Sequence, residues 1–423
     1  MARSAPRPLA RLLSIAPVLA AGLALALAVL ALAGAVLLPG KLAFALPALG
    51  PAGGLALAID PGRAELIFAV LAGGSAGLLA APGLGVSGVL VLAGLVDILA
   101  NNLYTLVFAA LIVGFLSLRD RVAAPAALAV LPAKLLALAA AAGLPGATLA
   151  AGAVLCPAGY LLAALGGDLL RFAQGTALGL AGLALVAAGL GDAGPGRLAL
   201  ETGALVAPVL MLAASRIEDV TGSRAPDWLG GLARGMPGFA LCFGGAVFWA
   251  SLLPPGPGFV AFQGIFDAAL RAGWPGALAA TGLACGFALA GFGAAGQFAL
   301  VCLGRPRSLR AAAAEDLPRR DLVALGLPVA AAAGLALVTA PVLLLVPLGL
   351  LLGLWRWSLR AGPIEAPPFE DGFARPPAWL PFGDPVTQIN ATGYAAPLHG
   401  PVAWLARRLA CRLGGARIAG RWS

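Results

Sequence analysis

Residues 275–303 read PGALAATGLACGFALAGFGAAGQFALVCL and contain no Asp, Glu, Lys, Arg or His in 29 positions. A helix needs about 20 such residues to cross the hydrocarbon core of a bilayer. Backbone groups find no water there and must pair within their own segment, which favours a helix over a strand. The stretch therefore predicts a transmembrane helix, and its many glycines and alanines predict close packing against other helices.

The rest of the chain has a similar composition. It has 423 residues, of which 61% are hydrophobic and 11% charged, with a mean hydropathy of +0.97. A soluble domain carries about 25% charged residues, so this chain has too few polar side chains to cover a globule. We predict an all-α, polytopic transmembrane helix bundle of about 12 spans, without a nucleotide-binding or redox domain of ordinary size.

The apolar runs give the approximate bounds of the spans. The run 12–38 is longer than the 7–15 residues of a signal-peptide core and is expected to remain as a helix. The run 258–271 is short enough to be a half-helix, so the candidates give an upper limit on the number of spans. They are 12–38, 64–81, 84–100, 102–118, 122–142, 147–165, 174–190, 198–215, 237–253, 258–271, 275–303, 321–338 and 340–357.

The chain changes character near residue 360. Seven prolines between positions 363 and 385 preclude a long helix there. Residues 402–413 form an amphipathic segment with arginines on one side, suited to the membrane surface or to a neighbouring subunit. We therefore expect a transmembrane domain at 1–360 and an extended tail with an amphipathic segment at 361–423.

Charge, cysteine and histidine exclude several classes of function. The net charge is +9, but most arginines lie at the chain ends and in short polar connections, which suits lipid headgroups better than nucleic acid. Counting Lys and Arg in the connections on the two sides of the membrane does not decide which side faces the cytoplasm. The five cysteines lack metal-ligand spacing and are expected to be small buried apolar residues. His399 is the single histidine. No cofactor, metal or nucleic-acid partner is expected.

One lysine stands out within a predicted span. Lys134 lies in the middle of 122–142, and Lys41 is the only other lysine in the chain. A desolvated lysine can lose its proton, whereas arginine cannot, so a proton relay favours lysine. Pro132 would loosen the helix and admit a water. The alternative is a structural pair with a carboxylate such as Asp97.

Three carboxylates also fall within predicted spans. Asp97 and Glu201 lie within about two turns of predicted helix ends, where contact with headgroups would suffice. Asp267 lies in the short run 258–271. Lys134 and Asp97 are the candidate proton-relay residues. Pro132, Pro254 and Pro255 are candidate helix breaks or hinges.

Several colinear segments resemble the antiporter-like membrane subunits shared by respiratory complex I, Mrp-type cation/proton antiporters and membrane-bound hydrogenases such as formate hydrogenlyase. DWLGGLARGMP at 227–237, LLPP at 252–255 and GFV at 258–260 are similar to the signature LGGLxRxMP … LPPxxGFxxE. LGRPRS at 303–308 resembles FLGxPRS, DLLRFA at 168–173 resembles DLKRLLAYSS, and ANNL at 100–103 resembles ADNLL. DGF at 371–373 and QINATGYAAPL at 388–398 resemble the CGY … MQYTxxxFxxPL ending of the hydrogenase branch.

This resemblance implies an antiporter-like fold with broken helices, and a proton path that is partly lost. The family moves protons through a glutamate, helix-centre lysines and water. Lys134 matches one of these lysines, and about two spans are missing after Arg121. A lone lysine cannot bridge about 30 Å of hydrocarbon. At the other matching positions this chain lacks the family's ionisable groups. Leu111 stands where the family has the glutamate, Gly203 where it has a histidine, Ala207 where it has a lysine, and Gly296 or Gln297 where it has another lysine.

The expected function follows from this shortened set of groups. The chain would be a membrane subunit of a proton-translocating oxidoreductase complex of the hydrogenase or NADH-quinone oxidoreductase type, in the bacterial inner membrane. Partner subunits would carry the redox chemistry. Two alternatives stay open: a non-conducting scaffold subunit of the same complex, and a component of a stand-alone cation/proton antiporter.

Overall fold

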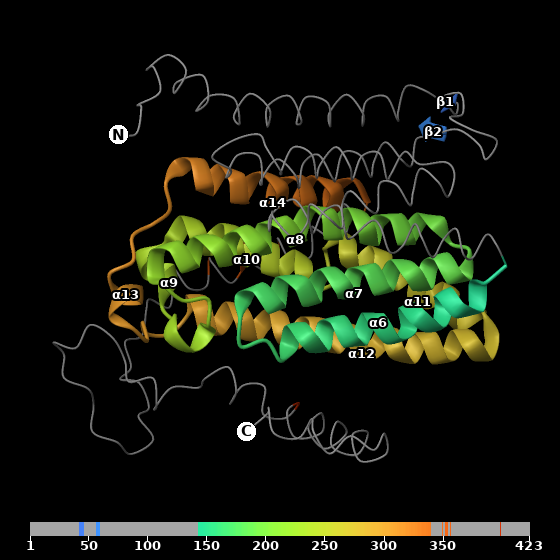
Figure 1. The fold of residues 1–423 in the computed structure, drawn as a ribbon, viewed down its shortest axis with the longest axis horizontal. Coiled ribbons are helices and arrows are strands. Elements are labelled where there is room, and N and C mark those ends of the chain that lie inside the picture. The colour runs from blue at the N-terminus through green and yellow to red at the C-terminus, as the bar shows by residue number, and fades with distance from the viewer. Residues whose placement is uncertain are drawn as a thin grey trace, which may run out of the picture.

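The computed structural model describes residues 42–45, 56–59 and 143–339, together with five single positions at 349, 352, 353, 356 and 398. The predicted spans before residue 143 and after residue 339 lie outside these residues, as do the tail and the domain boundary near residue 360. The described part is mainly helical (Figure 1).

Seven long helices occur where the apolar runs predict them. They are α6 (Pro145–Ala164), α7 (Leu169–Leu190), α8 (Ala193–Thr221), α10 (Pro237–Ala250), α11 (Pro257–Arg271), α12 (Gly273–Cys302) and α14 (Arg319–Thr339). Three short helical turns, η1 (Pro226–Trp228), α9 (Leu232–Gly235) and α13 (Leu309–Ala312), lie in the connections. Five helices, namely α6, α7, α8, α12 and α14, are long and apolar enough to cross a membrane. The chain is thus a multi-pass, all-α membrane protein.

Local caps mark the start of α7 and the ends of α7 and α8. Asp168 precedes α7, and its side chain accepts a 2.9 Å hydrogen bond from the amide nitrogen of Leu170. α7 ends at Gly191 and α8 at Gly222, both with positive φ, which glycine adopts without steric cost. The helices therefore end where the backbone can turn back into the bundle.

Helices α10 and α11 are two halves of one crossing, so the predicted runs 237–253 and 258–271 do not count as separate spans. They have 14 and 15 residues, about 21 and 22 Å each, whereas α12 has 30 residues, about 45 Å. Both halves run antiparallel along α12. Residue numbers that rise from α9 to α11 meet residue numbers that fall along α12. The contacting pairs are Gly231 with Leu303, Gly244 with Phe298, and Phe262 with Phe287. The expectation of a broken helix is confirmed.

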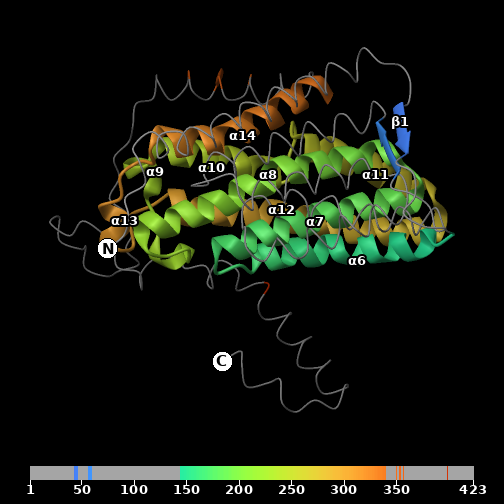
Figure 2. The same cartoon turned by 45° about the horizontal axis from the view of Figure 1, so that its top comes forward.

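Helix α8 lies at the centre of the described bundle. It contacts α7 on one side and α10, α11 and α14 on the other. α6 packs against α7 and α12, α12 also packs against α10 and α11, and α14 lies on the side of α8 away from α6 (Figure 2). This order leaves α8 the most completely buried of the long helices.

Glycines bring the backbones of α6, α7 and α12 into contact. A Cβ atom added at Gly152 of α6 would lie 2.5 Å from the amide nitrogen of Val186. One added at Gly286 of α12 would lie 2.7 Å from the Sγ atom of Cys156. The prediction that small residues permit dense helix packing is confirmed at these positions.

The cysteines are not uniformly buried. Cys156 and Cys302 are buried as predicted, but Cys285 is exposed on α12. The prediction fails there because a thiol behaves as a small apolar group and can face hydrocarbon. Cys411 lies outside the described residues.

A short β-hairpin was not expected from the sequence. Strands β1 (Leu42–Ala45) and β2 (Ala56–Ile59) pair antiparallel, with Leu42 opposite Ile59. They lie between the predicted runs 12–38 and 64–81. Their pairing satisfies backbone groups of the two strands.

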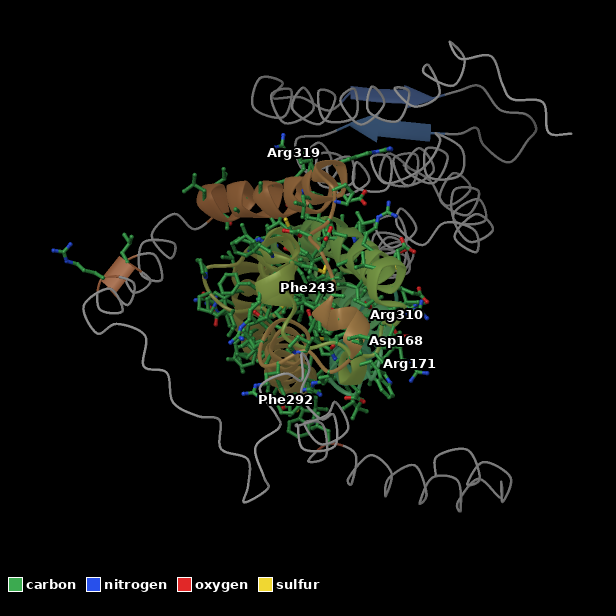
Figure 3. All side chains as sticks on the ribbon, turned by 90° about the vertical axis from the view of Figure 1, so that its left-hand side faces the viewer. Asp168, Arg171, Phe243, Phe292, Arg310 and Arg319 are labelled. Carbon is green, nitrogen blue, oxygen red and sulfur yellow. The ribbon has the colours of Figure 1, made fainter. Side chains whose placement is uncertain are left out.

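Most of the charge lies at one end of the bundle, seen in Figure 3, which labels Asp168, Arg171, Arg310 and Arg319. Nine of the eleven arginines between residues 143 and 339 belong to this arginine-rich end: Arg171, Arg216, Arg224, Arg234, Arg305, Arg307, Arg310, Arg319 and Arg320. Arg197 and Arg271 lie at the other end. Ion pairs tie the helix ends together here: Arg216 contacts Asp321 at 3.2 Å, and Arg224 contacts Asp168 at 3.5 Å.

Candidate functional site

The break between α10 and α11 spans residues 251–256. Pro254 and Pro255 lie within it, and neither has an N–H group to continue the helical ladder. The Ser251 hydroxyl donates a 2.6 Å hydrogen bond to the Phe248 carbonyl, and the Gly256 amide donates one of 2.9 Å to the Leu253 carbonyl. The chain thus leaves its helical path in the middle of a crossing and resumes it at Pro257.

The break faces α8. A Cβ atom added at Gly258, in the first turn of α11, would lie 3.4 Å from the Cγ2 atom of Thr202 on α8. Thr202 is buried, and its hydroxyl donates a 2.8 Å hydrogen bond to the Leu198 carbonyl. The N-terminus of α11 therefore begins beside the third turn of α8, and that end of a helix carries partial positive charge.

Glu201 is the residue before Thr202 and is buried, with 2% of its surface exposed. α8 begins at Ala193, so Glu201 lies about 12 Å from the start of the helix. The expectation that headgroup contact suffices for Glu201 is wrong, because the helix starts five residues before the run 198–215. Asp192 before the helix and Pro195 in its first turn are the signals that indicate the earlier start. Asp267, by contrast, is exposed on α11.

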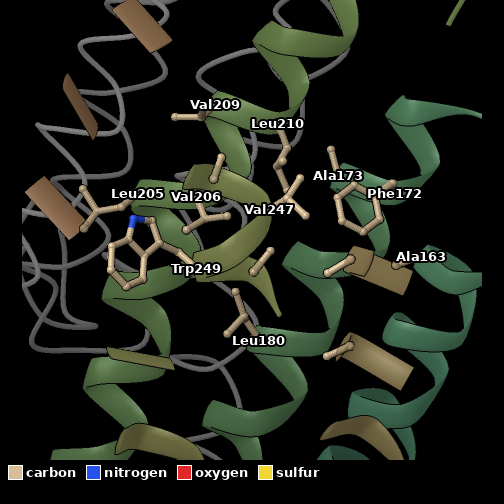
Figure 4. Close-up of a cluster of buried hydrophobic side chains, with 14 of the residues drawn as sticks. Ala163, Phe172, Ala173, Leu180, Leu205, Val206, Val209, Leu210, Val247 and Trp249 are labelled. Carbon is tan, nitrogen blue, oxygen red and sulfur yellow. The ribbon is translucent and has the colours of Figure 1, made fainter. Parts of the chain in front are cut away.

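Large side chains fix the break against its neighbours. Trp249 of α10 and Leu205 of α8 belong to the buried cluster in Figure 4. The indole nitrogen of Trp249 donates a 3.2 Å hydrogen bond to the Val329 carbonyl on α14. The end of α10 is thus fixed between two crossings.

Two of the segments that resemble family motifs form one contact, although they are about 75 residues apart. The Arg307 amide donates a 2.7 Å hydrogen bond to the Leu229 carbonyl, and the Gly231 amide donates one of 2.8 Å to the Leu303 carbonyl. The side chain of Arg307 is buried here. Burial lowers the pKa of its guanidinium, and the charge of Asp227 opposes that shift. This contact joins the start of α10 to the end of α12.

The structure also places Gln297, which lies near a position where the resemblance implies a lysine. It is buried on α12, and its amide nitrogen donates a 2.9 Å hydrogen bond to the Gly166 carbonyl after α6. Tyr160 is buried in the same part of the bundle, between α6 and α7.

Neither a protein-family model nor a curated protein sequence matches the chain. Solved structures do. A chain of the membrane-bound sulfane sulfur reductase, an archaeal respiratory membrane complex, matches with a TM-score of 0.64 and 16% identity, covering 96% of this chain and 94% of that one. A chain of the Mrp complex from a Dietzia species matches at 0.57, with 15% identity and coverage of 81% and 90%. A chain of respiratory complex I from Thermus thermophilus matches at 0.56, with 18% identity and coverage of 78% and 96%.

The chain has the antiporter-like fold. At these identities the likeness establishes the fold alone. Within it, Gly203 and Ala207 on α8 are both buried, so the bundle holds small residues where the resemblance implies a histidine and a lysine. Glu201 lies two residues before Gly203 on the same helix.

The remaining predicted site residues of the antiporter-like fold lie outside the described residues. These are Lys134, Asp97, Pro132 and Leu111. The relay role of Lys134 and Asp97 therefore stays a prediction. Pro254 and Pro255 lie in the break, and their role as a hinge also stays a prediction.

Proposed function

We propose that this chain is a membrane subunit of a proton-translocating oxidoreductase complex, in which it contributes to proton or cation translocation with a reduced set of ionisable groups. The observation that carries this proposal is the burial of Glu201 on α8, directly before Thr202, which packs against the first turn of α11 after the break. Inserting a carboxyl group into the membrane interior costs about 3 kcal/mol of free energy on insertion scales. Such groups are therefore retained mainly where they have a function.

The surroundings of Glu201 suit the transfer of a proton or cation. A carboxyl group can bind and release a proton, and the adjacent break interrupts the helical hydrogen bonding inside the bundle. Irregular backbone at membrane depth is tolerated where it is enclosed by protein or lines a hydrated cavity. The N-terminus of α11 begins beside α8 and favours the ionised form of a nearby carboxyl. Glu201 would therefore exchange protons with water or ions at the break.

Lys134 and Asp97 complete the proposed path. Lys134 would act as a relay that loses its proton when desolvated, with Pro132 admitting water to its helix. Asp97 would be the second relay group. The alternative, a purely structural Lys134–Asp97 pair, remains an outcome of the test below.

The other subunits of the complex would carry the redox chemistry and contact the tail at 361–423. A hydrogenase or an NADH-quinone oxidoreductase is the proposed partner enzyme, in the bacterial inner membrane. The arginine-rich end would face the cytoplasm, because Lys and Arg accumulate on that side of membrane proteins. A component of a stand-alone cation/proton antiporter is the alternative assembly.

A non-conducting scaffold is the second candidate function. It is favoured by the small residues at Gly203 and Ala207, where the resemblance implies ionisable groups. If the chain is a scaffold, substitution of Glu201 should not reduce ion transport by the complex.

Ion pumping by the purified complex in proteoliposomes distinguishes these functions. We expect Glu201→Gln and Lys134→Ala to lower pumping while the complex still assembles, and Glu201→Asp to retain most of it. Full pumping by both of the first two variants would instead support the scaffold.

A further inference from the structure

An apolar groove runs along the outside of the bundle between α10 and α12. Its volume is about 600 Å³, within the range of ligand sites in proteins. Leu241, Phe248 and Leu253 line it from the α10 side, and Gly291 and Phe298 line it from α12. Leu241 has 78% of its surface exposed, so the groove opens outward.

The lining offers almost nothing to a polar ligand. Among the described residues that line it, Ser251 is the one with a polar side chain, and its hydroxyl already donates to the Phe248 carbonyl at 2.6 Å. Space in the groove comes from glycines. A Cβ atom added at Gly291 would meet no other atom within 4 Å. The groove therefore suits a flexible apolar chain.

The groove follows α10, which is about 21 Å long. Its described lining is apolar along this length, and an acyl chain is the flexible apolar occupant that a bilayer supplies.

Positive charge lies at one end of the groove. Ala233 lines that end, and the exposed Arg234 follows it directly. Exposed Arg305 lies in the loop that the hydrogen bond between Gly231 and Leu303 holds against α9. Neither arginine forms an ion pair with another described residue. These cations lie at the end of the bundle where headgroups are expected.

We infer that this groove binds one anionic phospholipid, with an acyl chain between α10 and α12 and its phosphate at Arg234 and Arg305. Apolar walls with cations at one end complement the two parts of such a lipid. The binding does not depend on whether the chain conducts ions. It would fill the open side of the break near Leu253 and hold α10 against α12.

Native mass spectrometry of the full chain, with its co-purifying subunits, tests this inference. The delipidated protein is titrated with dioleoyl phosphatidylglycerol and, separately, with dioleoyl phosphatidylcholine. We expect one tightly retained phosphatidylglycerol. Arg234→Gln/Arg305→Gln should weaken it about 25-fold, about fivefold for each arginine, and should weaken phosphatidylcholine less, because choline offsets the charge of its phosphate. Gly291→Phe fills the groove and should weaken both lipids.

The matched control is Gly334→Phe on α14, where an added Cβ also meets no atom within 4 Å but no groove is filled. It should bind as the parent protein does. Unchanged phosphatidylglycerol binding in the double arginine variant overturns the inference, even if Gly291→Phe does not fold. So does a photocrosslinker at position 241 that captures a polypeptide instead of lipid.

Discussion

The carboxylate of Asp316 caps a helix, α10, that begins 79 residues earlier in the chain. Its Oδ2 atom accepts a 2.6 Å hydrogen bond from the amide nitrogen of Gly238, and its Oδ1 atom accepts one of 3.1 Å from that of Phe239. Both amides belong to the first turn of α10, where no helical carbonyl is available. The connection between α13 and α14 thus fixes the start of the broken crossing.

Replacing Asp316 with alanine should destabilise this end of the bundle. Loss of a helix cap costs about 0.5–2 kcal/mol, so Asp316→Ala should lower the unfolding temperature of the purified protein. Glu315→Ala removes the same charge from an exposed neighbouring position and is the control. Equal unfolding temperatures for the two variants would contradict the role of the cap.

The contact between α6 and α7 should not tolerate a methyl group. A Cβ atom at Gly152 would meet the amide nitrogen of Val186 at 2.5 Å, and overpacking of this kind costs about 1–3 kcal/mol. Gly152→Ala should therefore unfold at a lower temperature than the parent. Gly334→Ala, with open space around the added atom, should match or exceed the parent, because alanine is the better helix former.

The contact between the two motif segments gives a matched pair of glycines. Gly230 and Gly304 both have positive φ, at 86° and 77°. A Cβ atom at Gly230 would lie 2.6 Å from the Arg305 carbonyl oxygen, whereas one at Gly304 meets nothing within 4 Å. Both alanine variants carry about 1 kcal/mol of backbone strain. Gly230→Ala should lose more stability, because only its added methyl group also meets the Arg305 carbonyl oxygen. Limited proteolysis of the 227–236 segment measures the difference, and equal cleavage would show that the contact is loose.

We predict that the arginine-rich end faces the cytoplasm, because Lys and Arg accumulate on that side of membrane proteins. Ala313 and Ala272 are exposed at opposite ends of the bundle, so each can carry a cysteine for labelling with a membrane-impermeant maleimide. We expect Ala313→Cys to react in inside-out vesicles and Ala272→Cys in intact cells. The reverse pattern would place the arginine-rich end outside the cell.

Much of the fold can be predicted from the sequence because the bilayer allows apolar runs few structures. The seven apolar runs within residues 143–339 are all helices. Hydropathy does not locate their ends, since α7 and α8 each begin five residues before the apolar run, and α7 begins at a capping residue, Asp168. Because the apolar run begins at residue 198, the sequence predicts that Glu201 lies near a helix end and contacts headgroups. That the runs 237–253 and 258–271 form one crossing depends on their contacts with α12, which no local pattern contains.

The candidate site was predictable only in part. Pro254 and Pro255 mark the break because neither can donate a backbone hydrogen bond. The approach of Gly258 to Thr202 depends on how α8 and α11 pack, and the sequence alone does not specify that distance. Glu201 therefore gains its functional interest from the structure.

The number of ions moved per electron pair, measured in proteoliposomes holding the Glu201→Gln complex, tests the central claim most directly. Glutamine keeps the size and polarity of the side chain but cannot release a proton. We predict a lower ratio with electron transfer retained, and recovery of the ratio in Glu201→Asp. A ratio equal to that of the parent complex would contradict a role for Glu201 in translocation.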